Sequence, residues 1–448
     1  MNIVLGAGLT GLSVAFHLVK QGKRVIILEK TDRTGGQIRT IEKDGFVFET
    51  GPNTGVISNP ETAELLRTLH PNCVTQVADP SSSCRLIWKN GKFHALPSGI
   101  IGGITTPLFS LQDKLRIIGE PFRRRGNDPN ESVGALAVRR LGRSFLDYAV
   151  DPFVSGIYAG DPMRLVTRHA LPKLYNLEHT YGSFIRGAVT IGLSGFKNAR
   201  SKGVTKEIFS VRGGLSQLTN SLADAIGREN IILSADSILL ERSEDRWRVS
   251  FASPSGRFDL NAGRVITTLG AHALSPLLPF APEVEMNKIA RLRYAPVVQI
   301  SIGIRNIGKR NFRAFGGLVP SCEHQDVLGV LFPSACFNGR APEGGMLFSL
   351  FAGGIKNPHM VELSDREIEN LAIQTFHQML GFPPDVEPDL LHISRHQNAI
   401  PQYESDTGER LSAVNTLQNR FRGLTIAGNL RDGISIADRI RQGASLIS

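Results

Sequence analysis

The first residues whose types and spacing suggest chemistry are the glycines of Gly6-Ala7-Gly8-Leu9-Thr10-Gly11. In a G-x-G-x-x-G pattern the first glycine permits a tight turn, the second lets the backbone approach a pyrophosphate, and the third lets a helix pack on a strand. Glu29 follows 18 residues after Gly11, where a carboxylate can bind both ribose hydroxyls and would repel a 2′-phosphate. The spacing therefore predicts a dinucleotide site with its phosphates at a helix N-terminus.

A second glycine-rich segment follows, in which Gly35-Gly36 precedes Arg39. Such a pair can wrap a pyrophosphate from the side opposite the first motif. The alternative is an ordinary turn with a solvated arginine. Gly51-Pro52-Asn53 lies shortly downstream, and Lys30 is interpreted as a solvated loop charge.

These motifs need a strand–helix–strand unit to position them, and the apolar pattern near the N-terminus predicts one. Residues 3–5 are typical of a short buried strand, and residues 12–19 carry apolar side chains at helical spacing. Gly22 ends the predicted helix, and residues 24–28 predict a second buried strand. Two buried strands flanking a helix predict a parallel sheet and an α/β fold.

The middle of the chain, residues 96–205, predicts a mainly helical insertion. Two sets of apolar residues are each spaced to fall on one helical face: Leu108, Leu111, Leu115 and Ile118, then Val133, Ala137, Leu141 and Phe145. Strand character returns over residues 231–233, 247–251, 264–268, 297–304, 328–332 and 424–427.

The composition excludes several classes of protein. The length of 448 residues predicts two or three domains, and 41% hydrophobic with 21% charged residues exclude a disordered chain. Four widely separated cysteines exclude a disulfide scaffold and indicate a reducing compartment. Pro and Gly interrupt the longest uncharged stretches, so no membrane-spanning helix is predicted. His392 and His396 are separated by three residues, but we interpret them as structural and expect no metal.

The net charge of +10 is concentrated in one region. Residues 96–202 contain 15 Lys and Arg against 8 Asp and Glu, a net charge of +7. Such an excess indicates nucleic acid, an anionic membrane or an acidic substrate as partner. The sequence has no zinc-finger spacing and no RNA-binding aromatic motif, so we expect no nucleic-acid partner.

With these motifs in place, the sequence resembles the flavin amine oxidase superfamily, in which strand–GxGxxG–helix–strand–Glu is followed by R-x-G-G-x-x-x-T. Within it the chain most resembles the protoporphyrinogen oxidases of haem biosynthesis. The matching segments extend over nearly the whole chain: Gly51-Pro52-Asn53, His94-Ala95-Leu96-Pro97, Ser155-Gly156-Ile157-Tyr158-Ala159-Gly160-Asp161-Pro162, Ala399-Ile400-Pro401-Gln402-Tyr403, Ala427-Gly428-Asn429, and Gly433-Ile434-Ser435-Ile436 with Asp438. The amine oxidases proper end with aromatic residues beside the flavin, and this chain has none after Phe421.

Four positions depart from the family pattern. Gln37 stands where Arg, Lys or Trp is usual beside the pyrophosphate, and Ser237 stands where the backbone of a Val meets the adenine. Gly270 replaces a common Pro. Tyr403 is followed by Glu404-Ser405-Asp406 in place of an apolar-Gly-His continuation, which concerns the local substrate wall. None of these removes the expected flavin binding.

The resemblance implies an α/β fold with a Rossmann-like FAD-binding domain of the amine-oxidase type, a mixed-sheet substrate domain and a mainly helical inserted lobe. The implied boundaries are 1–80, 205–275 and 410–448 for the FAD-binding domain, 81–95 and 276–409 for the substrate domain, and 96–204 for the basic, membrane-facing lobe. The implied residues for non-covalent FAD are Gly6, Ala7, Gly8, Leu9, Thr10, Gly11, Glu29, Lys30, Gln37, Arg39, Gly51, Pro52, Asn53, Thr54, Ser237, Gly428, Asn429, Ile434, Ser435 and Ile436.

The implied reaction is the six-electron oxidation of protoporphyrinogen IX to protoporphyrin IX in three flavin cycles, with molecular oxygen reduced to peroxide. Hydride passes to flavin N5, so no acid–base side chain and no metal is expected. The substrate is an apolar disc with propionates, and the resemblance implies Arg85 for a propionate and Phe315 and Leu318 for the ring faces. The resemblance also implies lobe-side contacts from Ile157 and a position near the reacting carbon for Asn53.

Several alternatives and partners stay open at this point. Coproporphyrinogen III oxidation to coproporphyrin III, another amine-oxidase-type activity, and a non-enzymatic porphyrin carrier are the competing functions. Ferrochelatase is a candidate partner and a homodimer a candidate assembly. The basic lobe and the apolar substrate predict a cytoplasmic enzyme attached peripherally to the anionic inner face of the cell membrane, with the cluster Arg123-Arg124-Arg125 as the contact.

Overall fold

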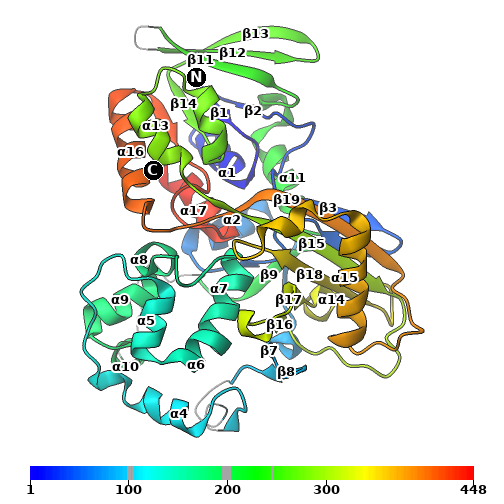
Figure 1. The fold of residues 1–448 in the computed structure, drawn as a ribbon. Helices are drawn as coiled ribbons and strands as arrows, with labels where there is room; N and C mark the ends of the chain where they lie inside the picture. The colour runs from blue at the N-terminus through cyan, green and yellow to red at the C-terminus, as the bar shows by residue number, and fades with distance from the viewer. Residues whose placement is uncertain (98–101, 103–104, 194–202, 244–245, 448) are drawn as a thin grey trace.

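The computed structural model describes residues 1–97, 102, 105–193, 203–243 and 246–447. Figure 1 shows three parts: an upper part that contains both termini, a sheet with covering helices at the lower right, and a helical lobe at the lower left. Parts of the lobe predicted at 96–204, namely residues 98–101, 103–104 and 194–202, lie outside the described residues. In the described part of the chain, the helices are all too short or too polar to cross a membrane.

The upper part is built on a five-stranded parallel sheet in the order β10-β2-β1-β14-β20. Its strands are β1 (Asn2–Leu5), β2 (Val25–Leu28), β10 (Ile231–Ile232), β14 (Arg264–Thr267) and β20 (Leu424–Ile426). The apolar residues of β1, β14 and β20 are buried on both faces, as is typical of parallel strands inside a sheet. The predicted strand–helix–strand unit and α/β class are confirmed, because α1 (Leu9–Lys20) joins β1 to β2.

Helices cover both faces of this sheet. One apolar core is formed with α1, α2 (Pro60–Leu69), α11 (Ser216–Ile226) and α17 (Ile436–Ser445). The other is formed with α12 (Leu274–Leu277), α13 (Glu283–Ala290) and α16 (Thr407–Arg420). The expected boundary at residue 276 therefore differs from the packing, since Met286 and Ile289 of α13 share a core with Trp247 of the upper part.

Smaller sheets complete the upper part. An antiparallel sheet at its top consists of β11 (Asp236–Ser243), β12 (Arg246–Ser253) and β13 (Gly256–Ala262). A second contains β5 (Gly55–Val56), β9 (Ile208–Val211) and β6 (Thr75–Val77). The hairpin of β3 (Thr40–Lys43) and β4 (Phe46–Glu49) reaches toward the lower right part, where Phe46 and Phe48 pack on Leu347.

The lower right part is a seven-stranded mixed sheet in the order β19-β15-β18-β17-β16-β7-β8. The strands are β7 (Arg85–Lys89), β8 (Lys92–Ala95), β15 (Tyr294–Ile304), β16 (Gly316–Leu318), β17 (Val327–Leu331), β18 (Met346–Gly353) and β19 (Leu390–Pro401). One face is apolar and packs on α15 (Asp365–Gln378), while α14 (Pro333–Cys336) precedes β18. The other face, called here the inner face, turns toward β4 and the lobe.

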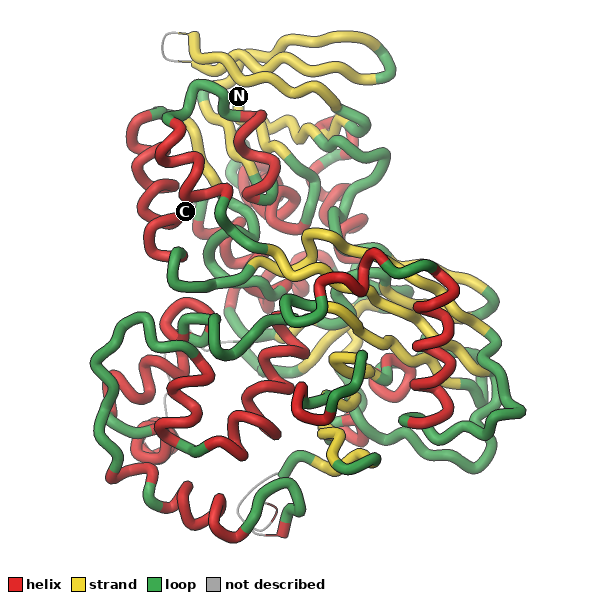
Figure 2. Tube along the Cα trace, viewed as in Figure 1, coloured by secondary structure: helices red, strands yellow, loops and turns green. Residues whose placement is uncertain are grey.

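The lobe is helical, as predicted, and Figure 2 shows it as helices joined by loops. Its helices are α4 (Leu111–Ile118), α5 (Val133–Arg140), α6 (Arg143–Phe145), α7 (Asp151–Tyr158), α8 (Thr167–Ala170), α9 (Pro172–Tyr181) and α10 (Phe184–Leu193). Two expectations were wrong in detail. Leu108 is buried before α4, because Ser110 caps that helix, and Leu141 ends α5, so Phe145 belongs to the next turn.

Candidate active site

The first glycine motif forms a turn that side chains would block. Gly6 has φ of +99°, a conformation that L side chains rarely adopt. A Cβ on Gly11 would overlap the carbonyl oxygen of Gly6, so only glycine lets α1 pack against the end of β1. Gly8 forms an isolated parallel bridge with Gly35, which brings the two glycine-rich segments together as the sequence predicts.

Glu29 is fixed by its own chain at the end of β2. Its Oε2 accepts from the Ala7 N–H at 2.7 Å, and its Oε1 accepts from the N–H and hydroxyl of Thr31 at 2.9 and 2.8 Å. These contacts leave one lone pair, on Oε2, for a ribose hydroxyl.

Arg33 was not among the predicted site residues, although it is the arginine of the R-x-G-G pattern. Its guanidinium donates to the carbonyls of Gly36, Ile38 and Thr34 at 2.6, 3.1 and 3.2 Å. Gly35 and Gly36 have φ of +107° and +59°, so Arg33 closes a turn that glycine permits.

The turn fits the pyrophosphate of a dinucleotide. Gly8 is the N-cap of α1 and provides no side-chain cap, so the first-turn N–H groups can meet an anion. A Cβ on Gly8 would come no closer than 3.9 Å to another part of the protein, so the fold itself does not require glycine at this position. The residues that would hold the diphosphate are therefore those of the Gly6–Gly11 turn and the Gly35-Gly36 turn.

The C-terminal loop lies beside this turn, because α17 packs on α1 and the Ser13 hydroxyl donates to the Ile440 carbonyl at 3.1 Å. Ser435 and Asp438 cap α17 reciprocally. Arg439, missed by the sequence analysis, donates to the carbonyls of Gly433 and Arg431 at 2.6 and 2.8 Å. It holds the loop that precedes the helix in place.

Tyr403 connects the end of β19 to the same loop. Its hydroxyl donates toward the carbonyls of Gly433 and Asn429 at 3.0 and 3.1 Å and accepts from the Gly433 N–H at 3.1 Å. Burial raises the pKa of Tyr403 to about 12, so it remains a neutral phenol. The next residue, Glu404, departs from the family pattern, in which an apolar residue follows the tyrosine. Glu404 forms ion pairs with Arg164 of the lobe and with Arg293.

Asn53 is fixed by both ends of its amide. Its Nδ2 donates to the Gly51 carbonyl at 3.1 Å, and its Oδ1 accepts from the Ser349 hydroxyl on β18 at 3.1 Å. Ser349 is fully buried on the inner face of the mixed sheet. The predicted Asn53 therefore lies where the upper part meets this sheet.

Arg85 lies on the same inner face. Arg85 is the register partner of Gly316, and Gly316 is the partner of Leu331. Leu331 is in turn the partner of Ser349. Register partners project to one face of a sheet, and three strand spacings of about 4.8 Å separate Arg85 from Ser349 by roughly 14 Å. Arg85 and Ser349, which contacts Asn53, thus lie at the two ends of one row across the sheet.

Aromatic and apolar side chains lie near the Arg85 end of this row. The Arg85 guanidinium lies 5.7 Å from the ring centre of Phe315. Leu318 is on the inner face and contacts α7, because a Cβ on Gly156 would overlap its Cδ2. Gly316 and Gly329 occupy neighbouring inner-face positions, where a Cβ on either would overlap the backbone of the adjacent strand.

Helix α7 presents Phe153 and Ile157, one turn apart, as exposed apolar residues on either side of Gly156. Ile157 was predicted and Phe153 was not, although the spacing of four residues is a signal for a shared face. The predicted substrate residues thus come from α7 and the mixed sheet, which converge at Leu318.

Four further residues predicted to bind the cofactor lie outside the two glycine turns: Gln37, Ser237, Lys30 and Arg39. Gln37 donates to the Asn398 and Ala399 carbonyls of β19 at 3.1 and 3.3 Å, so its side chain joins two parts of the protein. Ser237 is exposed, and its N–H donates to Asp236 Oδ1 at 2.7 Å, which leaves its carbonyl for an adenine. Lys30 and Arg39 are exposed. The described residues contain no cluster of three or more His, Cys, Asp or Glu that could hold a metal.

Comparison with known proteins agrees with this geometry. A model of the family described as flavin containing amine oxidoreductase matches residues 9–432. Mitochondrial protoporphyrinogen oxidase of Nicotiana tabacum is 30% identical, with 99% of this chain and 93% of that protein covered. Protoporphyrinogen oxidase of Bos taurus is also 30% identical, with 98% and 96% covered. A crystal structure from Exiguobacterium sp. 255-15 shares the fold, with a TM-score of 0.82, 22% identity, and 100% and 97% covered.

Proposed function

Because the chain belongs to the flavin-containing amine oxidoreductase family, we propose that it binds FAD non-covalently and oxidises protoporphyrinogen IX to protoporphyrin IX. It is a flavin-dependent oxidoreductase similar to protoporphyrinogen oxidases. The observation that supports the substrate best is the row from Arg85 to Ser349, the partner of Asn53, with a cation at one end and the apolar Leu318 and helix α7 beside it. A flat apolar ring with a carboxylate at its edge matches this arrangement.

The proposed reaction removes six hydrogen atoms from the porphyrinogen, and three molecules of dioxygen take them up as three molecules of peroxide. The bound flavin supplies the hydride acceptor in each of three cycles. Arg85 binds a propionate, the Asn53 amide orients the ring, and Leu318 with Phe153 and Ile157 excludes water. This reaction completes a porphyrin for haem synthesis.

Protein purified with its cofactor tests the proposal directly. It should be yellow, should lose the flavin absorption anaerobically with protoporphyrinogen IX, and should form fluorescent porphyrin in air. Bleaching by amines and not by porphyrinogens would replace the proposal with an amine oxidase. Yellow protein that binds porphyrin without turnover would identify a carrier.

Coproporphyrinogen III is the alternative substrate, and its four propionates need more cations than two do. Lys356, which contacts α7, pairs with Asp151 and donates to Ser321, whereas Arg85 has no acidic partner among the described residues. One unpaired cation favours protoporphyrinogen. A higher kcat/KM for coproporphyrinogen would reverse this assignment.

We expect Arg85→Ala to raise KM for protoporphyrinogen about 10–100-fold and to change kcat little. A charge-assisted bond to a carboxylate contributes about 1.5–3 kcal/mol in the ground and transition states alike. Initial rates of porphyrin fluorescence over a range of substrate concentrations measure both constants. Lys92→Ala, an exposed cation on neighbouring β8, is the control and should leave KM unchanged. A lower kcat at unchanged KM would assign Arg85 to the flavin instead.

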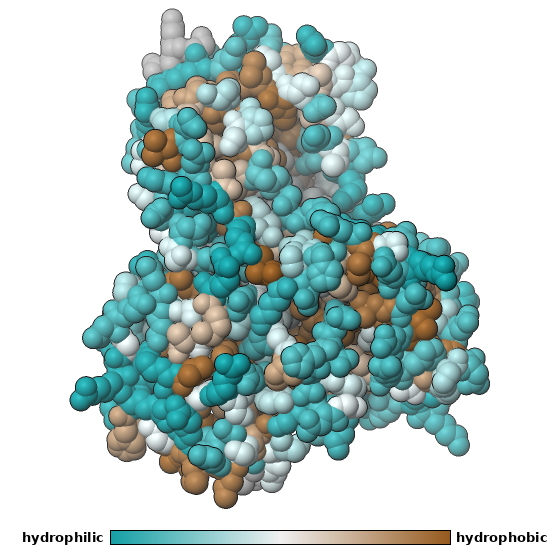
Figure 3. Space-filling model, in the orientation of Figure 1, coloured by the Kyte–Doolittle hydropathy of each residue, from teal (hydrophilic) through white to brown (hydrophobic). Residues whose placement is uncertain are grey.

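We also propose that the lobe attaches the enzyme peripherally to an anionic membrane at the inner face of the cell. Helix α4 has no buried residue, and Leu111, Leu115 and Ile118 are 74%, 60% and 69% exposed. Phe122 follows at 84% exposed, and Figure 3 shows hydrophobic residues gathered at the lower end of the lobe. Arg124 is exposed beside them. Apolar residues flanked by cations match an anionic lipid surface.

Replacing Leu115 and Phe122 by Ser should reduce flotation with anionic liposomes several-fold, because these side chains would bury in the acyl region. Val284→Ser is the control, since Val284 is 63% exposed on α13, far from the lobe in Figure 1. Arg124→Gln should also reduce flotation with anionic liposomes, and high salt should release the wild-type protein from them. Arg123 is unsuitable for this test because it donates to the Arg139 carbonyl at 3.1 Å. Equal flotation with neutral liposomes would contradict the charge contribution.

A further inference from the structure

The loop Glu49–Asn53, called here the Asn53 loop, accepts hydrogen bonds from polar side chains of the mixed sheet. Gln299 on β15 donates to the Glu49 carbonyl at 2.8 Å. His396 on β19 contacts the Thr50 carbonyl at 2.5 Å through Nε2, which must donate because a carbonyl only accepts. Ser349 on β18 donates to Asn53 Oδ1. Three strands of the mixed sheet thus each contribute one hydrogen bond to the Asn53 loop.

These donors are unusual for a sheet face. Gln299 and Ser349 are 2% and 0% exposed, and the opposite face of the same strands is apolar. Buried polar groups cost stability unless they are bonded, so their presence is explained by the loop that they bond. His396, interpreted from sequence as merely structural, therefore belongs to this set.

The contacts also determine the orientation of the Asn53 amide. The Gly51 carbonyl can only accept, so the atom facing it is Nδ2, and Oδ1 must face the Ser349 hydroxyl. Ser349 consequently donates. One N–H of Nδ2 and one lone pair of Oδ1 have no partner among the described residues, and they remain for a bound molecule.

We propose that Ser349 is a positioning residue that fixes the Asn53 amide for the reaction, with Gln299 and His396 as supporting donors. Through the Asn53 loop, the mixed sheet positions the Asn53 amide relative to the reacting carbon of the substrate. The inference rests on the proposed function, because it places Asn53 beside the substrate. It concerns residues of two parts of the chain that no sequence motif joins.

Ser349→Ala should lower kcat about 5-fold at unchanged KM, the size expected for one lost hydrogen bond. The Ser301→Ala variant is the matched control: Ser301 is the register partner of Ser349, is 2% exposed, and makes no side-chain hydrogen bond to the described residues. In an Asn53→Ala background, Ser349→Ala should have no further effect on kcat, because Ser349 acts through Asn53.

Hydrogen exchange provides a readout that does not depend on activity. Amides of residues 49–54 should exchange faster in holoprotein carrying Ser349→Ala or His396→Ala, and at the wild-type rate with Ser301→Ala. Independent, additive losses of kcat for Ser349 and Asn53, or equal exchange in all variants, would overturn the inference. Wild-type protein that fails to oxidise any porphyrinogen would overturn the proposed function alone, since the exchange result would stand.

Discussion

Gly8→Ala is expected to produce a folded protein that binds its flavin more weakly. Gly8 has φ of −71° and ψ of 174°, which alanine adopts without strain, and its Cβ would lie 3.9 Å from the nearest protein atom. The folded chain therefore tolerates the methyl group, whereas a diphosphate in contact with the Gly8 backbone does not. We expect FAD affinity to fall at least about 10-fold, or about 1.4 kcal/mol. Titration of apoprotein with FAD measures this loss.

Two further variants separate cofactor contact from folding. Gly11→Ala should lower both FAD affinity and apoprotein stability, because its Cβ would overlap the Gly6 carbonyl. Gly119→Ala should change neither, since Gly119 has a helical conformation and its Cβ would lie 3.6 Å from the Arg116 carbonyl oxygen, an ordinary contact. Retention of FAD by the Gly8 variant would show that the diphosphate does not lie on this turn.

The sequence predicted the parts of the site that depend on short-range pattern. The Gly6–Gly11 motif, Glu29 and the first strands follow from local spacing, because a turn, a helix and two buried strands each have their own signal. Arg33 could also have been predicted as a site residue, since it belongs to the glycine-rich segment. Its three carbonyl acceptors, however, are brought together only by the folded turn.

The contacts between distant segments could not be predicted in this way. Ser349 and Asn53 are 296 residues apart, and nothing in a serine on a buried strand indicates a donor to that loop. Helix α13 lies beyond the expected boundary because core membership depends on tertiary packing, and its apolar residues fit either part. Leu108 satisfied the helical spacing, but the helix begins only after it, because Ser110 is the N-cap of α4.

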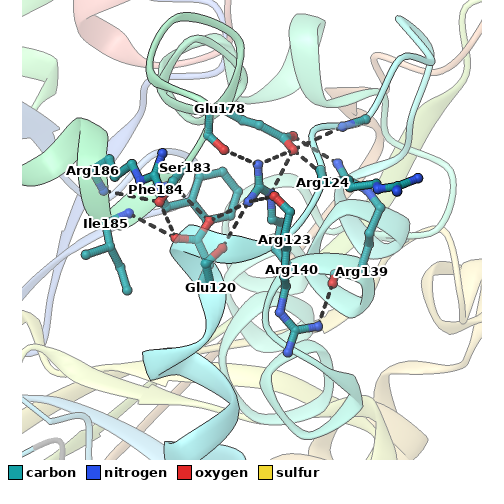
Figure 4. A network of polar contacts seen from close by, with 12 residues as sticks. Glu120, Arg123, Arg124, Arg139, Arg140, Glu178, Ser183, Phe184, Ile185 and Arg186 are labelled. Carbon is teal, nitrogen blue, oxygen red and sulfur yellow. Dashed lines mark hydrogen bonds and ion pairs between the residues drawn. The ribbon is translucent and has the colours of Figure 1, made fainter.

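Arg140→Met is expected to destabilise the lobe by about 3–5 kcal/mol, the cost of removing one partner from a buried ion pair. Arg140 and Glu120 are both fully buried, with Nη1 and Oε1 3.0 Å apart, and Arg140 lies 2.6 Å from Glu178 (Figure 4). Glu120 also accepts from the Ser183 hydroxyl and from the Phe184 N–H at the start of α10. Limited proteolysis between residues 105 and 193, with urea titration, measures the loss.

The partner charges provide the control. Arg139→Met should cost less, because Arg139 is 29% exposed and leaves Arg140 in place. Glu120→Gln combined with Arg140→Met should recover part of the stability, since it removes the uncompensated charge. If the single and double variants unfold at the same urea concentration, the buried charge is not the cause.

The pH dependence of the lobe follows from the same network. Burial would raise the pKa of Glu178, but hydrogen bonds from Arg139 and Arg140 outweigh it and hold that pKa below its usual value. A carboxyl with a lowered pKa stabilises the fold above the ordinary Glu pKa of about 4.3, and this contribution disappears as the pH falls through the folded value. Wild-type protein should therefore lose lobe stability below about pH 4, and Arg140→Met should lose less, because one of the groups that lower the pKa is gone. An equal acid dependence in both proteins would show that Arg140 does not hold the Glu178 carboxylate.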